Sequence, residues 1–177
     1  MRSLIAVEYL SLDGVMENPA WTGPYFNDEM SAFQREQLFA SDGLLLGRVT
    51  YQGMAAAWPA MTDTDGFAER INSLPKYVAS RSLLPTEWNA QLLNGNLVEA
   101  VGALKQQAGQ NLLLYGSGEI VNTLMAHGLI DEYHLLVHPL VVGIGKQLFG
   151  GGHPVALRLV ASRITQTGVA LLTYRPQ

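Results

Sequence analysis

The sequence predicts one α/β domain over residues 1–177, with a mostly parallel sheet covered by helices on both faces. Three observations predict this three-layer fold. Short apolar runs recur about every 30 residues, as strands do when helices connect them. The segments between these runs carry apolar side chains at helical spacing. The last two runs lie close together, which predicts an antiparallel pair.

The elements of the first half follow from apolar runs and capping residues. In order, we expect a strand at 3–10, an aromatic-rich loop at 15–26, a helix at 28–40, a strand at 43–47, a helix at 48–57 and a polar, partly mobile segment at 60–73. Asn27 or Asp28 caps the first helix, whose inner side carries Met30, Phe33 and Leu38. The strand at 43–47 has no polar face, so both of its faces should be covered.

The second half repeats this alternation and ends in a hairpin. In order, we expect strands at 76–80 and 91–93, a helix at 96–109, a strand at 111–115, a helix at 117–127, a strand at 132–138, a glycine-rich loop at 143–152, and hairpin strands at 157–166 and 168–175. Asn96 caps a helix with Leu97, Val101 and Leu104 on its inner side.

Composition limits the function. Hydrophobic residues make up 48% of the chain, which excludes intrinsic disorder, and the absence of Cys excludes disulfides and thiol nucleophiles. A net charge of −4 argues against nucleic-acid binding, which needs a basic face. No apolar stretch reaches the ~18 residues of a membrane span, and Glu8 ends the first run too early for a signal peptide. We therefore expect a cytoplasmic protein with no membrane partner.

Assembly is predicted from the same composition. Charged residues make up only 15% of the chain, and the final hairpin, 157–174, is apolar. A single domain with so few charges is expected to hide part of its surface. A homodimer is the commonest way to do so.

Three strand-to-helix junctions carry groups suited to phosphate. At Tyr115-Gly116-Ser117-Gly118, glycines allow close approach and a helix N-terminus offers N–H donors. At Gly47-Arg48-Val49-Thr50, the arginine fork and the Thr hydroxyl add further donors. Ser80-Arg81 follows a third strand at the end where open α/β sheets bind ligands.

Each junction alone also has an ordinary structural explanation. The glycines could form only a tight turn, and Arg48 could pair with a surface carboxylate. Three such junctions at the carboxyl ends of one parallel sheet instead predict a dinucleotide with a separate ribose phosphate, namely NADPH rather than NADH. No Rossmann fingerprint is present because Val121 stands at the third glycine position. No metal site is expected, since His134 and His138 lie ~13 Å apart along a strand.

Several segments resemble the dihydrofolate reductase superfamily, and specifically the bacterial family grouped with the reductase domain of riboflavin-biosynthesis deaminase-reductases. These segments are SLDG at 11–14, LGRVTY at 46–51, KYVASR at 76–81, YGSG at 115–118, and 131–139 together with 143–149. Their order and spacing span the chain. The resemblance implies an eight-stranded mixed sheet with a terminal antiparallel strand, and NADPH as the hydride donor.

The resemblance also implies roles for the residues of the three junctions. Arg48 and Thr50 would hold phosphates of NADPH, and Ser80 and Arg81 would hold its adenosine 2′-phosphate. The segment from Gly116 through Glu119 to Ile120 would carry the pyrophosphate.

The pocket acid is less clearly indicated. Glu29 stands four residues before Phe33, as the acid that grips the pterin does in dihydrofolate reductases. In an apolar cleft its pKa would be raised, which suits proton delivery. Alternatively, Asp28 and Glu29 only favour the helix N-terminus by charge. At position 13, Asp matches the pattern of the riboflavin-type reductases better than that of the folate reductases. Asp13 either binds substrate or caps a turn before Gly14.

Two functions remain open. The first is an NADPH-dependent reductase of a small pterin or aminopyrimidine, resembling either dihydrofolate reductase or 5-amino-6-(5-phosphoribosylamino)uracil reductase. Its proton would come from Glu29, Asp13 or water. The second is an NADP-binding sensor or scaffold without turnover, because a fold alone does not imply a function.

Overall fold

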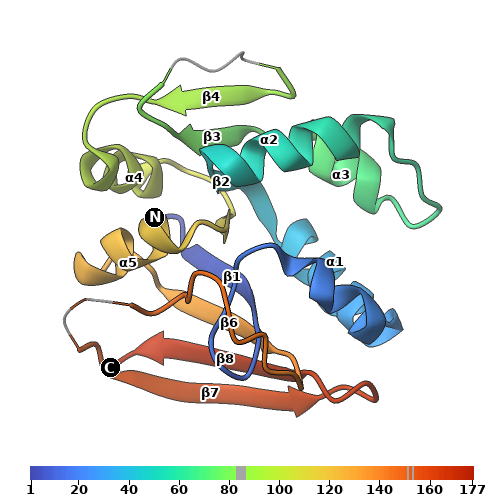
Figure 1. The fold of residues 1–177 in the computed structure, drawn as a ribbon. Helices are drawn as coiled ribbons and strands as arrows, with labels where there is room; N and C mark the ends of the chain where they lie inside the picture. Colours follow the sequence, from blue (N-terminus) through green and yellow to red (C-terminus); the bar gives the residue numbers. More distant parts are fainter. Residues whose placement is uncertain (83–86, 151, 153) are drawn as a thin grey trace.

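A computed structural model describes residues 1–82, 87–150, 152 and 154–177. Within these residues, one eight-stranded sheet runs in the order β4-β3-β2-β5-β1-β6-β8-β7 (Figure 1). The strands are β1 (Leu4–Leu10), β2 (Ser41–Gly47), β3 (Lys76–Ala79), β4 (Ala90–Leu93), β5 (Asn111–Tyr115), β6 (Glu132–Val137), β7 (Leu157–Ile164) and β8 (Ala170–Pro176). Only β8 runs antiparallel to its neighbours, β6 and β7. The predicted mostly parallel sheet with one antiparallel strand is confirmed.

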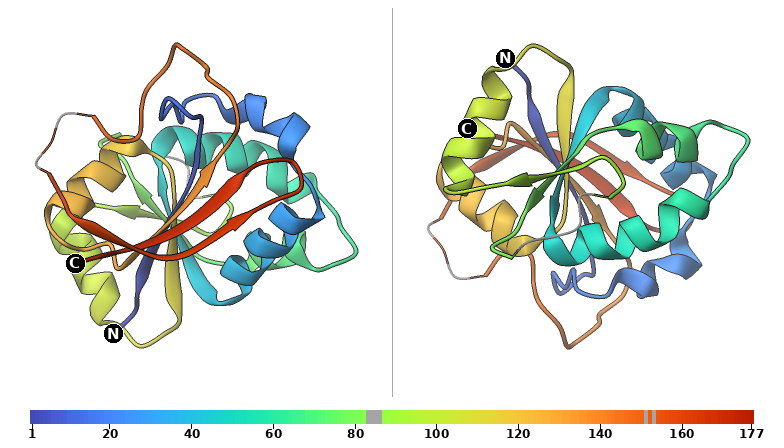
Figure 2. Two further views of the ribbon diagram at one scale, coloured as in Figure 1. Left: turned by 90° about the horizontal axis from the view of Figure 1, so that it is seen from below. Right: turned by 90° about the horizontal axis from the view of Figure 1, so that it is seen from above.

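Helices cover both faces of this sheet. They are η1 (Pro19–Tyr25), α1 (Asp28–Phe39), α2 (Arg48–Ala57), η2 (Trp58–Ala60), α3 (Phe67–Ser73), α4 (Leu97–Gln106) and α5 (Gly118–Ala126). α1, α2 and α3 lie on one face and α4 and α5 on the other, as both end-on views show (Figure 2). None of the described helices is long and apolar enough to span a membrane.

The core lies in two layers, one on each face of the sheet. Leu44 and Leu46 of β2 pack into the layer under α1–α3, whereas Leu45 packs into the layer under α4 and α5. All three side chains are fully buried. This alternation explains why the strand has no polar face, and it confirms that both faces are covered.

The structure corrects the expectation for the polar segment at 60–73. This segment contains helix α3, which buries Ala68 and Ile71. Gly66 begins the helix with a φ of +80°, and the Asp63 carboxylate accepts a hydrogen bond from the Gly66 amide at 3.0 Å. A helix of seven residues is too short to give a clear periodic signal. The expected aromatic loop likewise contains the 3-10 helix η1.

The amino ends of the strands hold three buried cations. Arg2, ahead of β1, pairs with Asp42 and donates to the Gln110 carbonyl at 3.1 Å. Lys105 pairs with Asp131 at 2.6 Å. All three cations, the third being Lys76, are at most 6% exposed.

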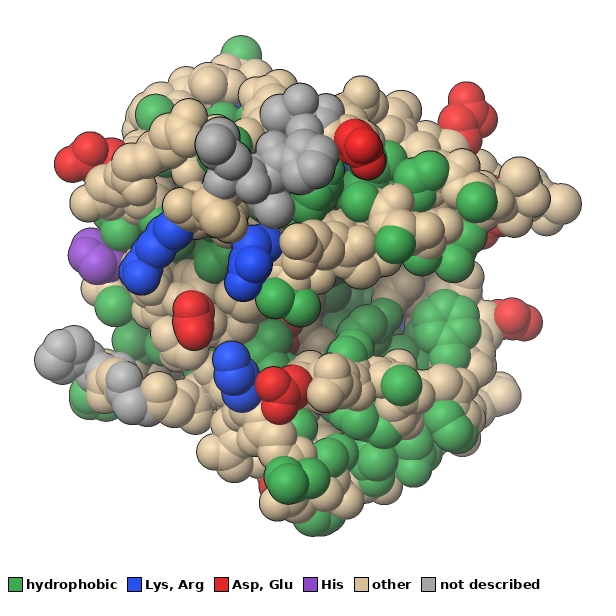
Figure 3. Space-filling model, turned by 45° about the horizontal axis from the view of Figure 1, so that its top comes forward, with side chains coloured by type: hydrophobic (Ala, Val, Ile, Leu, Met, Phe, Trp, Pro, Cys, Tyr) green, Lys and Arg blue, Asp and Glu red, His purple; other side chains and the backbone are tan. Residues whose placement is uncertain are grey.

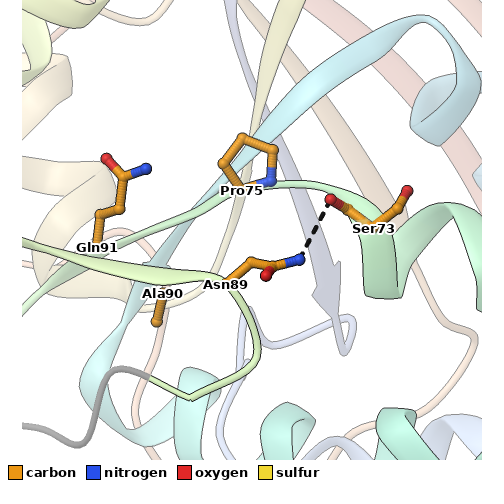
Figure 4. Close-up of a pocket in the computed structure, with 5 residues that line it drawn as sticks. All are labelled: Ser73, Pro75, Asn89, Ala90 and Gln91. Atoms are coloured by element: carbon orange, nitrogen blue, oxygen red, sulfur yellow. Dashed lines mark hydrogen bonds between the residues drawn. The ribbon is translucent and has the colours of Figure 1, made fainter.

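Lys76 is the first residue of β3. Its Nζ donates a hydrogen bond to the Asn72 carbonyl at 2.9 Å and lies 3.9 Å from the centroid of the Trp88 ring. Burial lowers its pKa to about 8. A polar pocket of about 450 Å³ opens at this edge (Figure 4). The residues that line this pocket come from the C-terminal end of α3 and from the starts of β3 and β4. Among them, the Asn89 side chain donates a hydrogen bond to the Ser73 carbonyl at 3.4 Å.

Candidate functional site

The three predicted junctions meet at the carboxyl edge of the sheet because β2 lies between β3 and β5. Gly47 is in register with Ala79 of β3, so Ser80 and Arg81 follow directly beside it. Leu46 is in register with Tyr115 of β5, so the turn that starts at Gly116 lies on the other side. The structure therefore brings together all three segments that the sequence singled out.

Close backbone packing joins the starts of α2 and α5. Gly116 has a φ of +48°, and a Cβ on it would lie 2.8 Å from the Thr50 hydroxyl oxygen. A Cβ on Gly47 would lie 3.2 Å from the Ser117 hydroxyl oxygen. The Gly47 amide donates to the Gly116 carbonyl at 3.4 Å, and the Gly116–Ser117 peptide is cis. Two helix N-termini with first-turn N–H groups thus lie next to each other.

The side chains at this edge differ in what they can offer an anion. Arg48 and Arg81 are exposed, and neither forms a hydrogen bond or ion pair with any residue in the described ranges. Val49 and Glu119 point to solvent as well. Ser80 donates to the Ser82 carbonyl at 3.1 Å within its own turn. The two arginines are the groups left available to a phosphate.

Ile120 fits its predicted role least well. Its side chain is 6% exposed and packs in the core under α4 and α5. Its amide donates to the Ser117 carbonyl at 3.0 Å, so it has no free donor. The amides ahead of it, at Gly118 and Glu119, have no intrahelical partner.

Aromatic side chains lie on the α1–α3 side of the same edge. Tyr9, Tyr25, Phe33 and Tyr115 are partly buried and pack against the core of this layer. The space-filling view shows a hollow with hydrophobic side chains at its floor and with Lys or Arg side chains to one side (Figure 3). Burial raises the pKa of both Tyr9 and Tyr115, so these phenols stay neutral.

His138 lies buried beneath these aromatic residues. Its ring makes edge contacts with Tyr9, Trp21 and Tyr25, at centroid distances between 5.3 and 5.8 Å. Nδ1 lies 2.9 Å from the Leu136 carbonyl oxygen and is therefore the protonated nitrogen. Burial lowers the pKa of His138, which keeps the ring neutral.

Asp13 fastens two loops together. Its carboxylate accepts hydrogen bonds from the Ser11 hydroxyl at 2.6 Å and from the amides of Val142 and Gly143 at 3.1 and 2.8 Å. These hydrogen bonds lower its pKa to about 2. The Glu17 carboxylate is exposed and accepts a hydrogen bond from the Lys146 amide at 3.1 Å. Both carboxylates hold the loop after β1 against the glycine-rich loop.

The environment expected for Glu29 is wrong. Its carboxylate accepts from the Gln166 amide at 2.7 Å, from Asn27 at 3.0 Å and from Arg163 at 3.2 Å. The Gln166 amide is the main reason why its pKa is lowered rather than raised. Glu29 therefore ties the start of α1 to the β7–β8 hairpin. Asp28 beside it is exposed at the helix N-terminus.

Glu8 of β1 was not anticipated as a site residue. It is 4% exposed, and its Oε1 accepts from the Gly116 amide at 2.9 Å. Burial raises its pKa to about 8, against the opposing effect of the Gly116 hydrogen bond. The sequence does contain a signal for it, because Glu8 is an acid inside an otherwise apolar strand.

Comparison with known proteins agrees with this geometry. The sequence model of the protein family named RibD C-terminal domain matches residues 2–172 of this chain. The uncharacterized protein YyaP of Bacillus subtilis (strain 168) is 33% identical over 137 residues, which cover 75% of this chain and 73% of that protein.

Two solved structures share the fold. RibD of Acinetobacter baumannii superposes with a TM-score of 0.72 at 15% identity, over 100% of this chain and 58% of that chain. Dihydrofolate reductase from Enterococcus faecalis, solved with NADP(H), superposes with a TM-score of 0.68 at 16% identity, over 99% and 96% of the two chains. The fold is therefore that of dihydrofolate reductase, and the chain belongs to the family of the RibD C-terminal domain.

Proposed function

We propose that this protein is an NADPH-dependent reductase that transfers hydride to a small planar heterocycle of the pterin or aminopyrimidine class. One observation carries the proposal. Three neighbouring strand ends place two helix N-termini and two exposed arginines, which have no partner among the described residues, at one edge of the sheet. Partly buried aromatic side chains lie on the α1–α3 side of this edge. Phosphates suit the first part of this site, and flat rings suit the second.

The residues at this edge fit the cofactor. Neither Gly47 nor Gly116 has room for a Cβ, because Ser117 and Thr50 fill those positions. The starts of α2 and α5 therefore pack closely, and the N–H groups of both first turns could face one pyrophosphate. Arg48 and Thr50 would hold phosphates, together with Gly118 and the first turn of α5. Ser80 and Arg81 would hold the adenosine 2′-phosphate. Bound there, NADPH would supply the hydride, and the protein would supply position and a dry surface.

The aromatic side chains would orient the substrate, and water would supply the proton. Asp13 and Glu29 both accept several hydrogen bonds that favour their ionised forms. A carboxylate with a lowered pKa is a poor proton donor near neutral pH. Tyr9, Tyr25 and Phe33 offer apolar faces to a ring. This chemistry needs a substrate with a C=N bond: the hydride would add to the carbon, and the nitrogen must be basic enough to take a proton from solvent.

The test is steady oxidation of NADPH, followed by its absorbance, with dihydrofolate and with the pyrimidine intermediate of riboflavin synthesis. The proposal expects turnover with one of the two and tight binding of NADPH in the absence of substrate. A protein that binds no NADPH contradicts the proposal.

The second candidate is an NADP-binding sensor or scaffold. The engagement of both Asp13 and Glu29 favours it, because neither acid is free to take part in a reaction. NADPH binding without oxidation of NADPH by any heterocycle of either class would support this alternative.

We also propose that the protein is a homodimer. β7 is an edge strand, and its exposed apolar side chains Leu159, Val160 and Ile164 support pairing with a second copy. Light scattering at micromolar concentration should give about twice the chain mass of 19.3 kDa. A mass equal to that of one chain at every salt concentration would reject the dimer.

A further inference from the structure

Glu8 is a buried acid in direct hydrogen-bond contact with the proposed cofactor turn, the segment 116–118. It sits in β1 between Val7 and Tyr9, in register with Leu135 of β6, and is almost fully buried. A carboxyl group in such a place is costly unless its oxygens have partners. Its Oε1 has one, the Gly116 amide at 2.9 Å, and its Oε2 forms no hydrogen bond with the described residues.

This hydrogen bond fixes the first peptide of the turn before α5. Gly116 is held from three directions. Glu8 accepts from its amide, the Gly47 amide donates to its carbonyl, and the Thr50 hydroxyl fills the position that a Cβ on Gly116 would take. Of these three, only Glu8 can change its charge. The protonation state of the Glu8 carboxyl group therefore acts directly on the backbone where the dinucleotide would lie.

The surroundings of Glu8 favour the neutral acid. Burial is the main cause of its shifted pKa of about 8, and no charged side chain in the described ranges contributes to it. Tyr115 on β5 and Tyr9 on β1 are the ionisable side chains near it, and both stay neutral. The charged groups at the turn itself, Arg48 and Glu119, are exposed.

We propose that Glu8 is a positioning residue for the cofactor turn. The neutral side chain holds this turn in place, and the ionised side chain repels the dinucleotide that binds there. The inference rests on the proposed function, because the repulsion acts on the phosphates of NADPH. Ionisation would place a buried negative charge directly behind the Gly116 amide. Charges buried in this way are weakly screened.

The experiment measures the dissociation constant of NADPH by the fluorescence of its nicotinamide, at pH 7.0 and pH 9.5. In the wild-type protein we expect the constant to rise about tenfold, which equals about 1.4 kcal/mol. Glu8→Gln keeps an acceptor for the Gly116 amide but cannot ionise, so its constant should match the wild type at pH 7.0 and hardly change at pH 9.5. Glu8→Leu removes the acceptor and should bind about tenfold more weakly at both pH values.

Controls separate this effect from other titrations. Glu99→Gln removes an exposed acid from α4 and should keep the wild-type pH profile. Lys76 titrates in the same range at the opposite edge, so the comparison with Glu8→Gln decides, rather than the wild-type profile alone. Thermal melting of each variant shows whether it is folded.

Two outcomes overturn the inference in different ways. NADPH binding with the same pH dependence in Glu8→Gln as in the wild type overturns the inference alone. A wild-type protein that binds no NADPH at either pH overturns the proposed function and the inference with it.

Discussion

The two edges of the parallel sheet treat their positive charges in opposite ways. At the amino edge, Arg2, Lys76 and Lys105 are buried, and each donates to a carboxylate or a carbonyl. At the carboxyl edge, Arg48 and Arg81 are exposed and bind nothing within the described residues. The first set holds the chain together, and the second set is available to a ligand.

The difference shows how a function can be inferred from what a fold leaves unpaired. Buried charges need partners in the folded chain, because an unpaired one costs several kcal/mol. Exposed arginines need no partner in the folded chain, and their position on the surface changes the stability of the fold little. Their position beside two helix N-termini, rather than their exposure, is what makes Arg48 and Arg81 informative.

The largest effect is expected at the amino edge. Asp42→Ala leaves the buried Arg2 guanidinium without its carboxylate, and should lower the free energy of unfolding by about 3–5 kcal/mol. Urea denaturation measures this loss. NADPH affinity at 25 °C should stay within twofold of the wild type wherever the variant is folded. A large loss of affinity in a folded Asp42→Ala protein would break the separation between the two edges.

The next effect is expected at the carboxyl edge. Arg81→Ala should weaken NADPH binding by about 1.5–3 kcal/mol, the range for hydrogen bonds to charged groups, and should hardly change NADH binding. Titration calorimetry with both cofactors measures the difference. Arg158→Ala, which removes an exposed arginine from β7, is the matched control. Equal losses for NADPH and NADH would remove Arg81 from the 2′-phosphate site.

The pH dependence of stability sharpens the comparison. The pKa of Lys76 is lowered from 10.5 to about 8, so the unfolded chain binds more protons between these values. Stability should therefore rise with pH through this range and be lost as pH falls through 8. This gain in stability should be absent in Lys76→Met. A wild-type profile in Lys76→Met would show that the amine is not desolvated.

Glu8 should produce the opposite slope from the other edge. Its pKa is raised from 4.5 to about 8, so the folded chain holds the extra proton between these values. The contribution of Glu8 to the free energy of unfolding is complete below pH 4.5 and is lost as pH rises through 8. Chemical denaturation of Glu8→Gln should show a flatter profile than the wild type between these pH values. The same slope in both proteins would contradict the burial of a neutral acid.

The smallest effect is expected at Glu29. Glu29→Gln loses an ionised acceptor for Arg163 and the Gln166 amide, and should lower Tm by about 2 °C at pH 7. Because the pKa of Glu29 is lowered, this difference should close as pH falls below its usual value of 4.5. Asp28→Asn is the control. A large loss of turnover at unchanged Tm would instead restore Glu29 as the pocket acid.

The fold was predictable where the signal is local. The apolar run at Leu44–Leu46 predicts a covered strand from three adjacent residues, and Asn27 and Asn96 do cap the helices expected after them. Helix α3 was missed because its start depends on the conformation of Gly66 and on the side chain of Asp63, not on an apolar period. Seven residues give too few turns to reveal a helical face.

The candidate site divides in the same way. Each of the three junctions is a short segment, so sequence could find it, and parallel pairing alone brings the three together. The partners of the acids are remote: Gln166 lies 137 residues from Glu29, and Gly116 lies 108 residues from Glu8. Helical spacing puts Glu29 and Phe33 on one side of α1, but it could not reveal the hairpin amide that binds the Glu29 carboxylate.

The strand order has a consequence for the folding of the chain. β7 precedes β8 in the sequence, yet β8 is the strand that joins β7 to the rest of the sheet. A chain in which β1 to β6 have already paired therefore carries an apolar, unpaired β7 until β8 inserts beside β6. During that interval Leu159, Val160 and Ile164 are open to any chaperone or neighbouring chain that binds extended apolar segments.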